Sequence, residues 1–250
     1  KQLIERWHGR DRLGYAITPR FALTSSEQQL AAAGRLAAEH PDVWVHTHLA
    51  ENHDEIDEIS RLYPEQRSYL DVYEHFGLLR RKSVFAHCLH LDDADIAAMA
   101  AGGGAAAFCP TSNLFLGSGL FDLRSLAESG VPVGLATDVG GVTTLSMLRT
   151  MGEAYKVLHM REQVLSGQRG LYLATLGAAR ALSLEHEIGN FEPGKEADFV
   201  VINPGGSSIS ARRSDRTSSI DERLFALMFL GDDRHIVASY LRGKSGWPPA

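Results

Sequence analysis

A short β-rich run that ends in polar residues decides the fold, and it reads Val43-Trp44-Val45-His46-Thr47-His48. An acidic helical pattern begins soon after it, at His53. Similar β-rich runs recur before and after this one, each followed by a helical pattern. Because strands that alternate with helices indicate parallel βαβ units, we predict a parallel sheet. The other predicted strands of this sheet are residues 15–18, 84–87, 105–109 and 131–137, with helices after the last of them over about 146–182.

Two helix starts carry sequence signals of their own. Thr24-Ser25-Ser26-Glu27 has the pattern of a capping box and predicts a helix that runs to about His40. Asp92 is a candidate N-cap for the helix that follows the strand at 84–87.

Polar side chains stand at or just after the carboxyl ends of the predicted strands, where a (β/α) barrel keeps its active site. A doubly wound sheet also places its site at strand ends, so position alone leaves both folds open. However, the glycines Gly102-Gly103-Gly104 precede a strand, which makes them a poor phosphate cradle. We therefore predict an α/β fold of the (β/α)8 TIM-barrel type. The polar strand-end residues are Arg20, His48, His87, Asn113 and Asp138.

The expected barrel is incomplete in this sequence. We count about five C-terminal βα units, whereas a barrel has eight, and three more units need roughly 90 residues. We expect residues 1–185 to form the C-terminal part of the barrel. Residues 186–250 are expected to form a small C-terminal β module, with strands at 199–202 and 236–241 separated by a polar loop at 205–216 and a helix at 221–229.

The bulk composition excludes several classes of protein. The 250 residues are 44% hydrophobic and 22% charged with a net charge of −6, which is ordinary for a globular chain and unlike a nucleic-acid-binding surface. The two cysteines, Cys88 and Cys109, are expected to be reduced core thiols of a cytoplasmic protein. The uncharged stretch at 97–120 contains Pro110 and several polar residues, so we predict no membrane segment.

Four residues offer the chemistry of a zinc hydrolase, which needs imidazole and carboxylate ligands and a further carboxylate that moves protons. His48, His87 and Asp138 each end a different predicted strand, and Glu51 follows His48 closely. Taken singly, a strand-end histidine is more often an ordinary hydrogen-bonding residue, and a Thr-Asp pair is more often a turn or cap. Their joint occurrence favours a metal site. A second interpretation uses His46 and His48 as a two-histidine motif, because residues two apart on a strand point the same way.

Longer segments resemble the last four barrel strands of the amidohydrolase superfamily. Residues 43–52 are similar to its strand-five motif, Phe85-Ala86-His87-Cys88 to its strand-six histidine, and residues 134–138 to its strand-eight aspartate. Residues 108–114 resemble strand seven. Within the superfamily, three further segments resemble the guanine deaminase family, namely residues 15–21, 188–195 and 230–234.

The resemblance implies a role for each candidate residue. His48 and His87 would be metal ligands, and Asp138 would be a ligand that also accepts a proton. Glu51 would carry a proton to the purine, while Arg20 would hydrogen-bond the guanine and Phe21 would pack on its face. The family further implies one zinc ion per subunit, with iron as the alternative, guanine as the substrate and a cytoplasmic homodimer. The His-x-His pair of the family's first barrel strand is absent from this sequence.

Two alternatives stay open at this stage. One is a related amidohydrolase that acts on another aminated heterocycle, which the segments around Arg20 and at 230–234 argue against. The other is a non-catalytic remnant that binds a partner, which the missing strands suggest. The second architecture of zinc deaminases is excluded, because it requires a Pro-Cys-x-x-Cys motif and this chain has only Cys109-Pro110.

Overall fold

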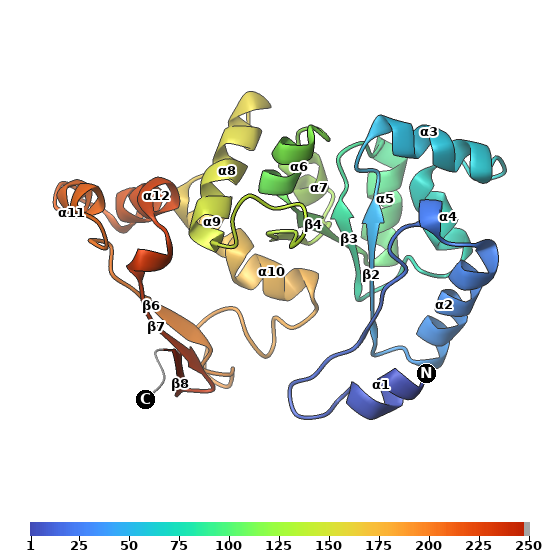
Figure 1. Cartoon of the computed structure of the whole chain (residues 1–250), viewed down its shortest axis with the longest axis horizontal. Helices are drawn as coiled ribbons and strands as arrows, with labels where there is room; N and C mark the ends of the chain where they lie inside the picture. The colour runs from blue at the N-terminus through green and yellow to red at the C-terminus, as the bar shows by residue number, and fades with distance from the viewer. Residues whose placement is uncertain (248–250) are drawn as a thin grey trace. The chain divides into compact units, whose positions relative to one another are not determined.

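The computed structural model describes residues 1–247, which divide into two compact units (Figure 1). The first unit consists of Lys1–Phe108 and Phe121–Val133, and the second of Cys109–Leu120 and the chain from Gly134 onward. The last three residues of the expected β module, 248–250, lie outside the described residues. None of the helices in the described part combines the length and apolarity that a membrane crossing requires.

The first unit is built of parallel strands joined by helices. Its strands are β1 (Ala16–Ile17), β2 (Trp44–Leu49), β3 (Ser83–His87), β4 (Ala105–Phe108) and the first residue of β5 (Val133–Leu135). Its helices are α1 (Gln2–Trp7), η1 (Ala22–Thr24), α2 (Glu27–Glu39), α3 (His53–Leu62), α4 (Tyr69–His75), α5 (Asp93–Gly102) and α7 (Leu123–Glu128). Figure 1 shows α2, α3, α4 and α5 grouped around β2 and β3.

The sheet runs in sequence order, β1-β2-β3-β4-β5. The pairs β1–β2, β2–β3 and β3–β4 are parallel, and Leu49 at the end of β2 lies beside His87 at the end of β3. This confirms the predicted α/β class with a parallel sheet. Because parallel strands end at the same edge, the residues that follow β1, β2 and β3 are brought together there.

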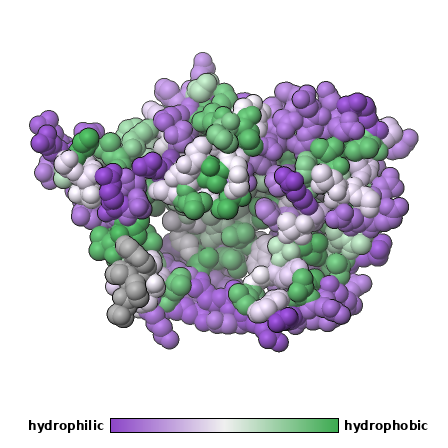
Figure 2. Space-filling view, in the orientation of Figure 1, coloured by the Kyte–Doolittle hydropathy of each residue, from purple (hydrophilic) through white to green (hydrophobic). Residues whose placement is uncertain are grey.

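Burial alternates along β2 but is complete in β3. In β2, Val45, Thr47 and Leu49 are buried, whereas His46 is exposed and His48 is half-buried. Every residue of β3 is buried. On α3, in contrast, most side chains are exposed, and Figure 2 shows a largely hydrophilic surface over this helix.

The second unit holds α6 (Pro110–Leu116), the rest of β5 and a mostly helical continuation. The helices are α8 (Met147–Met160), α9 (Gly167–Ala174), α10 (Leu176–Ala181), α11 (Ser208–Ser214), α12 (Ile220–Leu230) and η2 (Asp233–His235). An antiparallel sheet of β6 (Phe199–Ile202), β7 (Ile236–Leu241) and β8 (Lys244–Trp247) ends the described chain. The two strands predicted at 199–202 and 236–241 are therefore confirmed.

Three local predictions need correction. The helix expected from the Thr24–Glu27 capping box is capped by Ser26, whose hydroxyl accepts from the Gln29 amide, while Thr24 ends η1. The polar loop expected at 205–216 contains α11, because Ser207 and Ser210 form a capping box. Asn113, expected at a strand end, lies buried in α6, which begins at once after β4 because Pro110 occupies the first helical turn. The N-cap predicted at Asp92 is confirmed.

Candidate active site

The first unit brings five of the six sequence-predicted site residues together at the carboxyl ends of its strands. His48 is the fifth residue of β2, His87 ends β3, and Glu51 follows β2 by two residues. Arg20 and Phe21 lie in the segment that connects β1 with η1. The sixth residue, Asp138, belongs to the second unit and follows β5.

A backbone carbonyl fixes the ring of His48. Its Nδ1 lies 2.7 Å from the carbonyl oxygen of Arg20, which also accepts the backbone amide of His48 at 3.1 Å. Because a carbonyl oxygen only accepts hydrogen bonds, Nδ1 carries a proton, and Nε2 of the neutral ring keeps its lone pair. Metal-binding histidines have this arrangement in general, with one nitrogen anchored by a carbonyl and the other directed at the ion.

His87 is the second imidazole of the site. Its side chain is only 1% exposed, and its ring stacks on that of His48 with 5.3 Å between the centroids. One ring nitrogen of each histidine lies within 4.8 Å of the other. The two imidazoles are therefore candidate ligands for one ion of the kind that histidine nitrogens bind, such as zinc. His46, the other member of the alternative two-histidine motif, is exposed.

Glu51 places a carboxylate beside these rings. Its Oε2 lies 3.7 Å from Nε2 of His87, and its side chain is largely buried. Two hydrogen bonds fix the turn that carries Glu51. The Glu51 amide donates to Oε2 of Glu55, and the Glu55 amide donates to the side chain of Asn52, which is the N-cap of α3. Two imidazoles and one carboxylate therefore meet at one point of the first unit.

Arg20 and Phe21 border the histidines. The Phe21 ring lies 5.7 Å from that of His48, and the Arg20 guanidinium lies 5.2 Å from the centre of the Phe21 ring. The Arg20 side chain is exposed, and Phe21 is half-buried. An aromatic ring with a guanidinium over it offers a flat apolar surface and hydrogen-bond donors, which suits a flat heterocycle that carries acceptors.

Tyr73 on α4 supports the candidate site, although the sequence patterns did not indicate this residue. Its buried hydroxyl donates to the carbonyl oxygen of His48 at 2.8 Å, lies 2.9 Å from Oγ1 of Thr47 and accepts from the Ala22 amide at 3.0 Å. Burial raises its pKa to about 12. One side chain thus joins the end of β2 to the segment that carries Arg20 and Phe21. No sequence signal identifies it, because the contact spans 25 residues from His48 and 51 from Ala22.

The second unit holds Asp138 in a tight turn. Its carbonyl accepts from the amide of Gly141 at 3.1 Å. A Cβ at position 141 would lie 3.2 Å from Oδ2 of Asp138 and 2.9 Å from Oγ of the buried Ser112, so only glycine fits beside the carboxylate. Thr111 also donates to the carbonyl of Thr137 at 3.5 Å, which links α6 to the residue before Asp138.

Backbone strain gathers at the candidate residues in both units. Nine described non-glycine residues have positive φ, and four of them are Ala50, His87, Cys88 and Asp138, with φ between 50° and 73°. Two of these four are predicted metal ligands, and Ala50 directly precedes Glu51. Because L-residues adopt this conformation at a cost, it tends to persist where a functional geometry requires it.

The chain is similar in sequence to known proteins. Residues 1–245 match the sequence model of the Amidohydrolase family. Guanine deaminase of Escherichia coli (strain K12) is 52% identical over 244 residues, which cover 98% of this chain and 56% of that protein. Guanine deaminase of Mus musculus is 37% identical over 241 residues, which cover 93% of this chain and 53% of that protein. The chain therefore spans about half the length of the curated relatives it matches.

Solved structures give the same result. The E. coli guanine deaminase structure superposes with a TM-score of 0.98 at 51% identity and covers 100% of this chain and 58% of that one. Guanine deaminase from C. acetobutylicum, solved with guanine bound in its active site, superposes with a TM-score of 0.81 at 29% identity and covers 91% of this chain and 54% of that one.

Proposed function

Because the chain belongs to the amidohydrolase family, we propose that the protein carrying it is a guanine deaminase, which hydrolyses guanine to xanthine and ammonia. The observation that carries this proposal is the 52% identity to E. coli guanine deaminase over nearly the whole chain. The cluster of His48, His87 and Glu51 supplies the kind of groups that such a hydrolysis needs.

The proposed cofactor is one zinc ion per subunit, with iron as the alternative. His48 and His87 would hold it, and the family resemblance adds Asp138 as a third ligand. The donor chemistry fits, because the lone pair on Nε2 of His48 is left available by the carbonyl of Arg20. When bound, such an ion supplies a hydroxide nucleophile near neutral pH, where free water supplies almost none.

Glu51 is the proposed proton carrier. Its carboxylate, 3.7 Å from the His87 ring, would take a proton from the attacking water and pass it to a ring nitrogen of guanine. Asp138 would accept a further proton. The water adds at the carbon that bears the amino group, and the bond from this carbon to the amino nitrogen breaks. The proton accepted by Asp138 goes to the amino group, which leaves as ammonia, while the proton carried by Glu51 stays on the ring nitrogen of xanthine.

Arg20 and Phe21 are the proposed recognition residues. Guanine presents a ring carbonyl and acceptor nitrogens, and a guanidinium offers only donors. Adenine has an amino group where guanine has the carbonyl, so the same guanidinium would meet a donor and lose a hydrogen bond. The Phe21 ring, next to both Arg20 and His48, would pack on the face of the base.

At larger scale, we propose that the parallel sheet is part of a (β/α)8 barrel, with residues 1–185 in the barrel and residues 186–250 in a C-terminal β module. The parallel register of β1 to β4 supports this proposal, as does the superposition of this whole chain on a part of E. coli guanine deaminase. A cytoplasmic homodimer is the proposed state of the whole protein, and it rests on the family resemblance alone.

A substrate panel tests the proposed function. The purified protein is assayed for ammonia release from guanine, adenine, cytosine and ammeline under the same conditions. We expect guanine to have the highest kcat/KM, and xanthine to form in equal amount to the ammonia. Preferred turnover of ammeline or adenine would assign the protein to another branch of the family. No ammonia from any of the four, in protein that contains metal, would contradict the proposed activity.

A further inference from the structure

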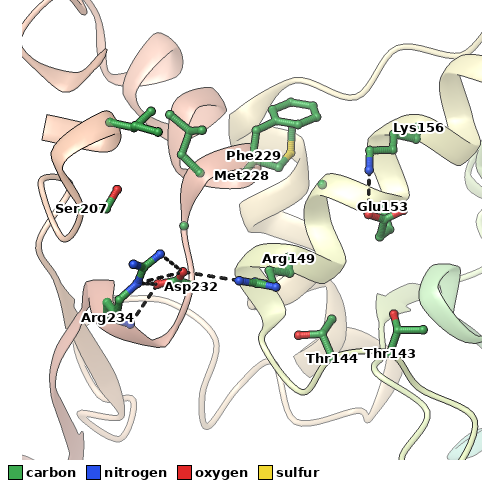
Figure 3. Close-up of a pocket in the computed structure, with 14 residues that line it drawn as sticks. Thr143, Thr144, Arg149, Glu153, Lys156, Ser207, Met228, Phe229, Asp232 and Arg234 are labelled. Carbon is green, nitrogen blue, oxygen red and sulfur yellow. Dashed lines mark hydrogen bonds and ion pairs between the residues drawn. The ribbon is translucent and has the colours of Figure 1, made fainter. Parts of the chain in front are cut away.

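The second unit contains a cavity of about 390 Å³ whose walls include none of the residues proposed for the reaction. It lies between the first half of α8, the end of α12, the turn at 231–234 and the start of α11 (Figure 3). Ligand pockets for small molecules have volumes of roughly 300–1,000 Å³. The cavity is therefore large enough for a small organic ligand.

A buried carboxylate holds two arginines at this cavity. Asp232 has a side chain only 6% exposed and accepts from Nε of Arg234 at 3.0 Å and from its Nη2 at 2.6 Å. Arg149 reaches the same carboxylate from α8, with Nη2 at 3.5 Å from Oδ2. Figure 3 shows the two guanidinium groups approaching Asp232 from opposite sides. The hydrogen bonds from Arg234 hold the pKa of Asp232 well below its usual range.

The contacts with Asp232 leave an excess positive charge and unused N–H donors on Arg149 and Arg234. Two guanidinium groups against one carboxylate give a net charge of +1, while Lys156 and Glu153 of the same wall pair with each other at 2.8 Å. The side chains of Arg149 and Arg234 are 59% and 63% exposed. Each guanidinium has five N–H groups, and the contacts with Asp232 use only a part of them. The remaining N–H groups form a donor-rich wall that is suited to an oxyanion.

The rest of the wall divides into hydroxyl groups and apolar side chains. Thr143 and Thr144 contribute hydroxyls, and that of Thr144 accepts from the Ser146 amide, which leaves its own proton to donate. The hydroxyl of Ser207 already caps α11. Ile209 and Phe229 contribute exposed apolar surface, whereas Met228 is buried behind them. Ile209 is 67% exposed and Phe229 is 40% exposed. A ligand that matches this lining has a compact anion at one end and an apolar or aromatic group at the other.

We propose that this cavity binds a nucleoside monophosphate. The phosphate lies between Arg149 and Arg234, because two forked cations and neighbouring hydroxyls match its several oxygens better than the two oxygens of a carboxylate. The base contacts Ile209 and Phe229. The site is separate in its residues from the proposed deamination chemistry, so it does not depend on the proposed function.

Calorimetric titration of the purified protein tests the proposal. The probes are uridine and adenosine 5′-monophosphates, the two nucleosides without phosphate, and inorganic phosphate. Neither base is guanine, so the proposed deamination site does not contribute to binding. We expect at least one monophosphate to bind, inorganic phosphate to bind at least tenfold more weakly, and the nucleosides to give no signal. Affinity should fall as salt is added, because exposed charges are screened.

Two variants test whether the monophosphate binds in this cavity. Arg149→Ala is expected to weaken monophosphate binding tenfold or more, and the fold should be retained because Arg149 has one long contact with Asp232. Ile209→Ser is expected to weaken the binding of the monophosphate but leave the affinity for inorganic phosphate unchanged. The matched control is Arg169→Ala on α9, an exposed arginine outside the cavity, which should bind as the parent protein does.

Three results would overturn the proposal. One is no binding of either monophosphate by the folded protein. Another is equal affinity for the monophosphates and for inorganic phosphate, which would remove the role of the apolar wall. The last is unchanged binding in Arg149→Ala, which would place the ligand elsewhere on the protein.

Discussion

At the scale of single residues, the candidate active site depends on backbone groups as much as on side chains. Arg20 was expected to act through its guanidinium, yet its carbonyl fixes both the ring and the amide of His48. Sequence patterns identified His48, His87 and Glu51 because polar residues after strands are visible in a single sequence. The carbonyl contact could not be found in this way, since every residue has a carbonyl.

The first prediction concerns Glu51. Glu51→Gln keeps the shape of the side chain but cannot carry a proton, so kcat for guanine should fall by about 10²–10⁴-fold. Metal content should stay unchanged, because the two histidines remain. Steady-state kinetics together with elemental analysis measures both. Glu65→Gln, at an exposed position after α3, is the control. Near-normal turnover in Glu51→Gln would mean that another group carries the proton.

The second prediction concerns Arg20. Alanine at this position keeps the carbonyl that anchors His48, so the substitution removes the guanidinium alone. We expect kcat/KM for guanine to fall sharply and the preference over adenine, about 10³-fold or more in the parent, to narrow. Arg20→Lys should recover little, because one ammonium cannot replace a planar fork. A loss of thermal stability with unchanged guanine kinetics would instead make Arg20 a structural residue.

At the scale of secondary-structure elements, two of the three strands of the C-terminal sheet were predicted, whereas β8 and the helix α11 were not. Residues 199–202 and 236–241 have β-branched and aromatic patterns that local propensity identifies. The helix α11 was missed because its serines and arginines resemble a polar loop. Its capping residue Ser210 is buried against His235, 25 residues away, and such a contact is invisible to local patterns.

The third prediction concerns the link between α4 and β2. Tyr73→Phe removes the hydroxyl that bonds the carbonyl of His48 and the amide of Ala22, and it leaves buried groups without a partner. We expect the free energy of unfolding to fall by about 1–3 kcal/mol. Urea denaturation measures this change. Tyr63→Phe, in the same unit, is the matched control. An unchanged midpoint in Tyr73→Phe would show that the hydroxyl does not hold these elements together.

The fourth prediction concerns the turn between α12 and β7. Asp232 bonds Arg234 and His235, and its pKa in the folded protein lies well below the usual range, mainly because Arg234 bonds it. A carboxyl group with a depressed folded pKa stabilises the fold above its unfolded pKa of about 3.9 and loses that contribution as the pH falls. Asp232→Asn should therefore be less stable than the parent at pH 7.

Denaturation midpoints measured between pH 7 and pH 3 check this prediction. The difference between Asp232→Asn and the parent should stay constant down to about pH 5 and shrink below about pH 4. Asp233→Asn, at the exposed neighbouring position, should have the same denaturation midpoint as the parent at every pH. A difference that persists undiminished at pH 3 would mean that the carboxylate charge does not stabilise the turn.

At the scale of the whole molecule, the family assignment and the proposed reaction agree. The parallel direction of the strands was predictable, because alternating β-rich and helical runs identify parallel units. The closure of a barrel was not, because about half the length of the matched relatives lies outside the chain. The candidate site was predictable to the extent that each candidate ligand stands at or just after the end of its own strand. Its support by Tyr73 and Glu55 depends on contacts between elements, which a single sequence does not reveal.

If the protein is a metal-dependent hydrolase, it contains a bound metal ion, and the metal content of the purified protein tests this most directly. Elemental analysis of the purified full-length protein should find about one zinc ion per subunit, or iron in its place. His87→Ala should lower this value strongly, whereas the exposed His186→Ala should leave it unchanged. Absence of any transition metal from folded protein would contradict the account.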